Sequence, residues 1–319
     1  MKLTESAKRL LVSMQLKADL SLKEVAQLLN CREHTARRAA AEIERSGFFI
    51  RKASLNLSRL GYTEYNLYLS FNSDNLSQRD RIISSLAGMR GVKWVLEVTS
   101  GFDLLVGFAA RSPSEVTAFF EEIYESNGGF LLAKTVLAVV SYHYYGRRYL
   151  VTANVEGRSL DAEDTGTAGS VDEIDHKILR GLTHIGYQSI AQLERKLRIP
   201  ASTIRLRIQK LSRLGIIVGM TYNLARIPPG LHVYRVHIYT RGGARCLLAN
   251  LKKFARSDPS VVYIVKTLGP WDFELQYETL DPACMPQLGR KLVQAIGEQL
   301  LKVNILPVAG ISKAAAYPF

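Results

Sequence analysis

The chain has 319 residues, of which 47% are hydrophobic and 22% charged, with a mean hydropathy near zero. This composition excludes a disordered tail and a fibre. No stretch has the length and apolarity of a membrane helix, and charged residues stand where a signal peptide needs an apolar block, so we expect a cytoplasmic protein without membrane contact. Cys31, Cys246 and Cys284 lie far apart and not at metal-ligand spacing, and we expect neither a metal site nor a cofactor.

The positive charge is concentrated in two segments. The chain holds 42 Lys and Arg against 29 Asp and Glu, a net charge of +13. Residues 1–60 carry +6 and residues 175–227 carry +8, whereas the rest of the chain sums to −1. Such a balance favours a polyanionic partner. Because the two basic segments have similar lengths, they also suggest an internal repeat.

The repeat is visible when the chain is shifted by 168 positions, which places residues 21–50 over residues 189–218. Six positions are then identical, and the apolar positions coincide. The two copies are separated by residues 151–172, which have no helical or alternating apolar period and are rich in Gly, Ser, Thr and acid, as is typical of a mobile linker. We therefore predict two halves of one architecture. The identical pairs are Ser21/Ser189, Leu29/Leu197, Thr35/Thr203, Arg37/Arg205, Arg45/Arg213 and Gly47/Gly215.

Each basic segment has the pattern of three short helices. In the second copy Ile174, Ile178 and Leu182 recur every four residues and predict an amphipathic first helix, matched by Leu10 and Met14 in the first copy. A second helix is predicted to begin at a capping box in each copy. The two capping boxes are Ser189 with Gln192 and Ser21 with Glu24.

The third helix is predicted from about Pro200 to Leu214 and is followed by Gly215, a residue suited to the left-handed conformation that ends a helix, as is Gly47. On a helical wheel Ile204, Ile208 and Leu211 form a buried stripe. The opposite side consists of Ser202, Leu206, Gln209, Lys210 and Arg213.

A helix with an apolar back and a front of hydroxyl, amide and cationic groups suits the major groove of DNA, so we predict a helix-turn-helix with double-stranded DNA as its partner. An ordinary surface helix with a solvated charged face is the alternative. In the first copy Glu33, Glu42 and Glu44 place carboxylates near any phosphate. The second copy is therefore the stronger candidate, and the first binds weakly, reads another sequence or serves as scaffold. The predicted DNA-binding residues are Ser202, Thr203, Arg205, Arg207, Gln209, Lys210, Arg213, His34, Thr35, Arg37, Arg38 and Arg45.

Hairpin-like apolar segments at residues 48–50 and 216–218 follow the third helices and resemble the wing or the connecting strand that follows many such modules. After them, short β-rich and amphipathic runs alternate in the order βαββαβ, the ferredoxin-like unit. In residues 62–71, for example, Tyr65, Leu67, Leu69 and Phe71 show the period of a strand with one buried face. The predicted fold class is α+β, with helix-turn-helix domains at 1–60 and 173–227, βαββαβ effector domains at 61–150 and 228–319, and the linker at 151–172.

This architecture resembles the Lrp/AsnC (feast/famine) transcriptional regulators. The resemblance is clearest in DEIDHKILRGL, in STIRLRIQKLSRLGII and in the β-turn-β elements EVTSGFDLLV and VKTLGPWDFEL. Gly269 to Asp272 fits the Gly-x-aromatic-Asp turn of the family, whereas Ser100 replaces the first glycine of the other turn. Pro200 and Arg32 stand where family recognition helices commonly begin with Ser. Most members carry one copy, so the tandem form is a departure.

The resemblance implies a sequence-specific DNA-binding transcriptional regulator that forms dimers or larger homo-oligomers and responds to a small effector such as an amino acid. It places the effector near the two polar turns, although turn geometry alone also explains their Gly and Asp residues. Pairing of the halves within one chain and pairing between chains both remain open. The effector-binding residues that it implies are Thr99, Ser100, Gly101, Asp103, Thr267, Gly269 and Asp272.

The same architecture is also similar to the siroheme decarboxylases, which makes an enzyme the alternative. Its site would use His and Arg to hold carboxylates and to move a proton. Packing beside a sheet explains each histidine equally well, and we find no nucleophile-base pair, phosphate loop or metal cluster, so we expect that the chain is not an enzyme. An interaction protein with a degenerate first helix-turn-helix is a third alternative. The candidates for the enzyme are His143, His232, His237, Arg147, Arg148 and Arg235.

Overall fold

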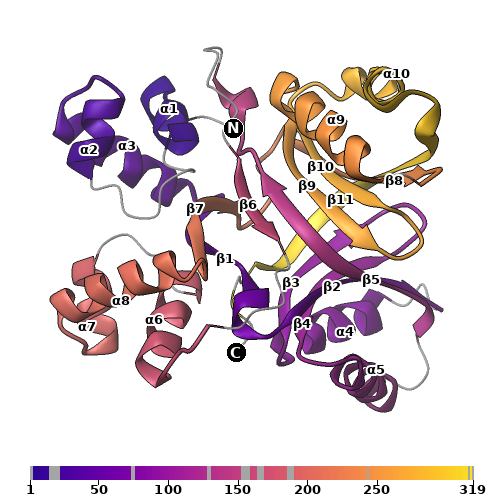
Figure 1. Ribbon diagram of the computed structural model, residues 1–319, viewed down its shortest axis with the longest axis horizontal. Coiled ribbons are helices and arrows are strands. Elements are labelled where there is room, and N and C mark those ends of the chain that lie inside the picture. Colours follow the sequence, from indigo (N-terminus) through magenta and orange to yellow (C-terminus); the bar gives the residue numbers. More distant parts are fainter. Residues whose placement is uncertain are drawn as a thin grey trace. The chain divides into compact units, whose positions relative to one another are not determined.

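The computed structural model describes residues 3–13, 22–72, 76–127, 131–151, 159–163, 169–184, 190–242, 244–314 and 317. It is a mixed α/β chain in which one order of elements occurs twice (Figure 1). The first series is α1 (Glu5–Ser13), α2 (Leu22–Leu28), α3 (Glu33–Ser46), β1 (Phe49–Leu55), β2 (Thr63–Phe71), α4 (Leu76–Gly88), β3 (Val92–Val98), β4 (Leu104–Ala110), α5 (Pro113–Asn127) and β5 (Leu131–Tyr144). The second is α6 (Glu173–His184), α7 (Ile190–Leu197), α8 (Ala201–Arg213), β7 (Ile217–Leu224), β8 (His232–Thr240), α9 (Ala244–Ser257), β9 (Val261–Leu268), β10 (Phe273–Thr279), α10 (Met285–Ile296) and β11 (Leu300–Ala314).

The chain divides into two compact units, each of which joins segments of both halves. Unit 1 consists of residues 1–50, 140–162 and 220–308, and unit 2 of residues 51–139, 163–219 and 309–319. Each unit thus contains one three-helix module and one sheet domain. In unit 1 the three-helix module comes from the first half of the sequence and the sheet domain from the second, and in unit 2 the origins are reversed. None of the helices in the described part of the chain has the length and apolarity needed to cross a membrane.

In unit 2 the sheet has the strand order β5–β2–β4–β3 with antiparallel neighbours. Helices α4 and α5 cover one face (Figure 1). The predicted alternation in β2 is confirmed, because Leu67 and Leu69 lie in the core beneath these helices, with Tyr65 and Phe71 partly buried against it. The expectation of a single buried face was too narrow, because Tyr68 on the other face is also buried and lies beside Phe102.

In unit 1 the order is β11–β8–β10–β9, and α9 and α10 cover one face of the sheet (Figure 1). The core contains Phe273, Leu275 and Tyr277 from the central strand β10. The intervening residues Glu274, Gln276 and Glu278 are buried as well. Burial of both faces of β10 therefore requires partners for three polar side chains.

Each three-helix module packs its third helix against the first two. The buried stripe of α8 is Ile204, Ile208 and Leu211, as predicted. Gly47 and Gly215 both have positive φ, +64° and +69°, at the ends of their helices, which confirms the predicted termination. Ser21, Ser189 and Met14 lie outside the described residues, together with residues 152–158 and 164–168 of the expected linker.

One expectation about connecting segments needs correction. Residues 160–163, assigned to a mobile linker, form strand β6 (Leu160–Glu163), which pairs with β5, and the Asp161 carboxylate accepts a hydrogen bond from His143 on β5. The segments at 48–50 and 216–218 lead into the single strands β1 and β7, so the structure has the connecting strand and not a local hairpin. Their backbone groups bond to distant segments, for example from Ala225 N to Phe48 O in unit 1.

Candidate nucleic-acid interface

Helix α8 presents one continuous exposed stripe opposite its buried side. Its residues recur at intervals of three, four and seven positions, so their side chains lie in neighbouring rows on one side of the helix. Two arginines, one hydroxyl and one amide surround a leucine on this surface. We call it the α8 outer face, and it consists of Ser202, Arg205, Leu206, Gln209 and Arg213.

The ends of α8 are fixed by local contacts. At the start, Pro200 offers no side-chain cap, and the carboxylate of Glu194 on α7 accepts a hydrogen bond from the backbone nitrogen of Ala201 at 3.0 Å. At the other end, Gly215 N donates to Ser212 O and Ile216 N to Leu211 O, both at 3.0 Å, in the Schellman pattern. The helix is therefore held at both ends without using its outer face.

Two of the predicted DNA-binding residues, Arg207 and Lys210, lie on a flank of α8 and bind carboxylates at the N-terminal end of α6. Arg207 pairs with Asp172 and, at 3.2 Å, with Asp175, while Lys210 pairs with Asp175 at 2.8 Å. The side chain of Asp175 is fully buried. These cations hold α8 against α6.

The same two aspartates cap α6. Asp175 N donates to the carboxylate of Asp172 at 2.9 Å, and Asp172 N donates to that of Asp175 at 3.2 Å. This reciprocal pattern is a capping box with aspartate at both positions. The hydrogen bond from Asp175 N, followed by that from Arg207, lowers the pKa of Asp172.

Helix α3 in the first module differs from α8 in its buried stripe and in the contacts of its arginines. Its buried stripe contains Ala36, Ala39 and Ile43, smaller on average than the stripe of α8. Arg37 pairs with Glu33 at 2.9 Å, and Arg45 donates to a carbonyl of its own helix. The exposed residues of α3 at positions equivalent to the α8 outer face are His34, Arg37, Arg38, Ala41 and Arg45, whereas Thr35, like Thr203 in α8, is half-buried.

Glu42, expected to face phosphate, binds the start of α1 instead. Its carboxylate accepts hydrogen bonds from Thr4 N and Thr4 Oγ1, both at 2.7 Å. The bond from Thr4 N is the main reason that the pKa of Glu42 is lowered. Glu42 occupies the position of Lys210 in the repeat, so both modules use this position to join the third helix to the first.

The turns predicted to contact an effector are held by their own aspartates. Asp103 accepts from Phe71 N at 2.8 Å and pairs with Arg79 at 3.2 Å. Asp272 accepts from Thr240 N and Thr240 Oγ1, both at 2.8 Å. These carboxylates shape the turns. Thr267 is also engaged, because its hydroxyl donates to Trp271 O, whereas Thr99, Ser100, Gly101 and Gly269 are exposed.

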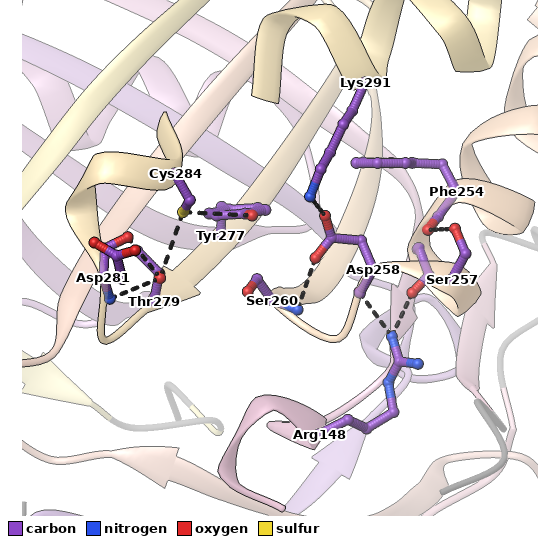
Figure 2. A network of polar contacts seen from close by, with 11 residues as sticks. Arg148, Phe254, Ser257, Asp258, Ser260, Tyr277, Thr279, Asp281, Cys284 and Lys291 are labelled. Atoms are coloured by element: carbon purple, nitrogen blue, oxygen red, sulfur yellow. Dashed lines mark hydrogen bonds and ion pairs between the residues drawn. The ribbon is translucent and has the colours of Figure 1, made fainter. Parts of the chain in front are cut away.

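The arginines considered for an enzyme bind protein groups within unit 1. Arg148 donates to the carbonyls of Ala255, Arg256 and Asp258 at the end of α9. Figure 2 shows its guanidinium pointing toward this end of the helix. Figure 2 also shows the carboxylate of Asp258 between Ser260 N and Lys291 Nζ. Arg148 thus donates hydrogen bonds to carbonyl groups at the C-terminal end of α9, where a helix leaves its last carbonyls without partners of its own.

Arg147 forms a buried, bidentate ion pair with Glu278 on β10, with Nε–Oε2 and Nη2–Oε1 distances of 2.9 and 3.0 Å. Tyr149 donates to the same carboxylate at 2.7 Å, and Gln276 donates to it as well. Burial disfavours the Arg147 charge, and Glu278 more than offsets this, so the pKa of Arg147 is raised. Arg235 lies over the Tyr263 ring, 4.7 Å from its centroid. No sequence motif predicts this cluster, because its arginine and glutamate are far apart in the sequence and meet only in the folded chain.

The histidines occupy three different environments. His143 is buried, with Nε2 3.0 Å from Ser141 Oγ and Nδ1 3.0 Å from Asp161 Oδ1. His237 is also buried and stacks on Trp271, with ring centroids 3.8 Å apart. His232 is exposed at the start of β8. The described residues therefore do not bring the three histidines together as one open site.

Comparisons with known proteins give a short sequence match and a long structural one. No protein-family model matches the chain. An uncharacterized HTH-type transcriptional regulator of Pyrococcus furiosus is 40% identical over 50 residues, which cover 16% of this chain and 32% of that protein. A protein of the same description from Pyrococcus abyssi is 43% identical over 47 residues, covering 15% and 30%. The match thus spans about a third of the length of these curated relatives.

Among solved structures, the siroheme decarboxylase NirDL aligns with 99% of this chain and 94% of its own, with a TM-score of 0.61 and 13% identity. An AsnC family transcriptional regulator from Agrobacterium tumefaciens aligns with 44% of the chain and 90% of its own, with a TM-score of 0.35 and 22% identity. The full-length likeness shows the fold: the duplicated architecture also occurs in NirDL.

This comparison corrects one expectation. The sequence predicts that the chain is not an enzyme, because packing beside a sheet explains each histidine and no nucleophile-base pair, phosphate loop or metal cluster is found. The fold that covers nearly the whole chain is that of an enzyme, NirDL. A categorical exclusion of enzymatic activity is therefore wrong, because one architecture serves different functions.

Proposed function

We propose that this chain is a sequence-specific DNA-binding transcriptional regulator. The observation that carries the proposal is the α8 outer face, where exposed Arg205 and Arg213 flank Gln209. Arginine binds phosphate and guanine, and glutamine binds adenine through two hydrogen bonds. The short sequence match to HTH-type regulators supports the same reading.

The contacts of α8 separate the residues that hold the helix in place from those that are exposed. Ile204, Ile208 and Leu211 bury one side, and the ion pairs of Arg207 and Lys210 fix the rotation of the helix against α6. In the proposal these two cations position the helix, and the outer face enters the major groove. Ser202 and Gln209 then read base edges.

In this proposal α8 supplies most of the affinity. The α3 surface has His34 and Arg38 exposed, but Arg37 and Arg45 make contacts within their own helix. A cation that already has a carboxylate partner gains less from phosphate. We therefore assign α3 a weaker role with a different base preference.

The proposal includes a homo-oligomer and a small effector such as an amino acid. Asp103 and Asp272 shape their turns, which leaves the exposed residues Ser100, Gly101 and Gly269 as effector contacts. Thermal unfolding with each amino acid added singly tests this part. We expect one amino acid to raise the midpoint temperature of unfolding, because it binds the folded state. A midpoint temperature that no amino acid changes contradicts the proposed effector.

DNA binding is tested with the full-length protein and a duplex enriched from a random library. Fluorescence anisotropy compares wild type with Arg205→Ala plus Arg213→Ala. Two phosphate or base contacts of this kind cost about 2–5 kcal/mol, or about 30- to 4000-fold in Kd. The control Arg290→Ala removes an exposed charge from α10 and leaves Kd within about threefold. Equal affinity of wild type and the α8 variant contradicts the proposal.

A second candidate function is decarboxylation of a siroheme-like tetrapyrrole, favoured by the full-length fold likeness to NirDL. In this chain His143 and His237 are buried, so exposed His232 is the candidate histidine best placed to meet an external substrate. Anaerobic incubation with siroheme, followed by mass spectrometry, tests it through the mass lost as carbon dioxide. An unchanged siroheme mass contradicts this candidate.

A further inference from the structure

The α8 outer face has an apolar centre. Leu206 is 67% exposed, although Ile204, Ile208 and Leu211 already supply the buried stripe of the helix. Leu206 lies about 160° from Ile204 around the helix axis, so it contributes nothing to this core. Its exposure leaves apolar surface in water that a partner can cover.

The surroundings of Leu206 define the chemistry of that partner. Ser202 and Gln209 lie four residues before and three after it, so their side chains flank it on the helix surface. Arg205 precedes it directly, and Arg213 lies seven residues further along the same side. A complementary surface is therefore anionic at its rim, carries hydrogen-bonding groups, and has a small apolar group opposite Leu206.

Double-stranded DNA with a thymine in the major groove has these features. Phosphates supply the anionic rim, and the thymine C5-methyl is the apolar group among the base edges of the groove. Building on the proposed function, we propose that Leu206 packs on a thymine methyl and makes α8 select thymine at one position or at two adjacent ones. The equivalent residue of α3, Arg38, offers a cation in place of the alkyl group, so the two helices select different bases.

Replacing thymine by uracil removes this methyl and keeps the base pair. Full-length protein is used to enrich a duplex from a random library, and each thymine of that duplex is then replaced in turn. Burial of one methyl is worth about 0.8 kcal/mol, which corresponds to about a fourfold increase in Kd on its removal. We expect this loss at one or two positions for wild type, and at none for Leu206→Ala, which binds the thymine duplex at least about fourfold more weakly than wild type does.

Two controls separate this effect from misfolding. Leu206→Ala retains the thermal midpoint, because an exposed helical leucine is replaced by a residue of higher helix propensity. Leu280→Ala truncates another exposed leucine, 53% accessible, and keeps the difference between thymine and uracil. If wild type binds the enriched duplex specifically and no replacement of thymine by uracil changes its Kd, the inference about Leu206 is wrong and the proposed function stands. Failure to enrich any duplex overturns both the inference and the proposed function.

Discussion

Arg147 and Glu278 form a bidentate ion pair that is almost completely withdrawn from water, with side-chain exposures of 3% and 0%. The arginine follows β5 of the first half of the sequence, and the glutamate belongs to β10 of the second, so the pair joins two segments of unit 1 that lie 131 positions apart. Because each charge needs the other in this environment, the stability of unit 1 depends on both.

Replacing Glu278 by Gln leaves the Arg147 charge buried without its counter-charge. We expect the free energy of unfolding to fall by about 3–5 kcal/mol, measured by urea denaturation. The matched control is Glu33→Gln, which breaks the Arg37–Glu33 pair, whose side chains are 48% and 71% exposed for Glu33 and Arg37. That exposed pair contributes at most about 1 kcal/mol, and equal losses in the two variants contradict the buried role of Glu278.

Asp175→Asn tests the anchor between α6 and α8. The change weakens the ion pairs to Arg207 and Lys210 and the capping bond from Asp172 N. We expect hydrogen exchange of the α8 amides to become faster by an amount equivalent to about 1.5–3 kcal/mol, the range for hydrogen bonds to charged groups. Exchange rates in α8 that match those of wild type contradict an anchoring role for this carboxylate.

His237 gives unit 1 a dependence on pH. Burial of the imidazole, followed by the charge of Arg235, lowers its pKa from 6.5 to about 3. Between these values the unfolded chain takes up a proton that the folded chain does not, so stability falls as the pH falls, by up to about 1.4 kcal/mol per pH unit.

The variant His237→Phe keeps an aromatic ring against Trp271 and removes the titration. Denaturation between pH 4 and about pH 7 is expected to show a shallower loss of stability for this variant than for wild type. Parallel curves for the two proteins are the outcome that contradicts a buried, neutral His237.

Two glycine replacements are expected to have opposite effects. Gly215 has φ +69° at the end of α8, so alanine there is strained and lowers stability by about 1 kcal/mol. Gly289 lies inside α10, and a Cβ atom at this position meets nothing within 4 Å, so alanine there raises stability by up to about 1 kcal/mol. Thermal unfolding measures both variants, and a shift of the same sign in both rejects the backbone explanation.

The sequence predicted the elements well because their signals are local. The period of Ile204, Ile208 and Leu211 marks the buried side of α8, and Gly215 marks its end. Burial of the polar face of β10 has no such signal, because Glu278 meets Arg147 only in the folded chain. For the same reason the sequence did not reveal that Arg207 binds aspartates of α6.

The central claim is tested most directly by the salt dependence of binding to the enriched duplex and to a scrambled duplex of equal length. The account predicts tighter binding of the enriched duplex at every salt concentration, and a plot of log K against log salt with a negative slope of several units. Arg213→Ala lowers the magnitude of that slope by about one unit, and Arg290→Ala, which changes an exposed residue of α10, does not. Equal affinities for the two duplexes, with slopes unaffected by Arg213→Ala, would contradict it.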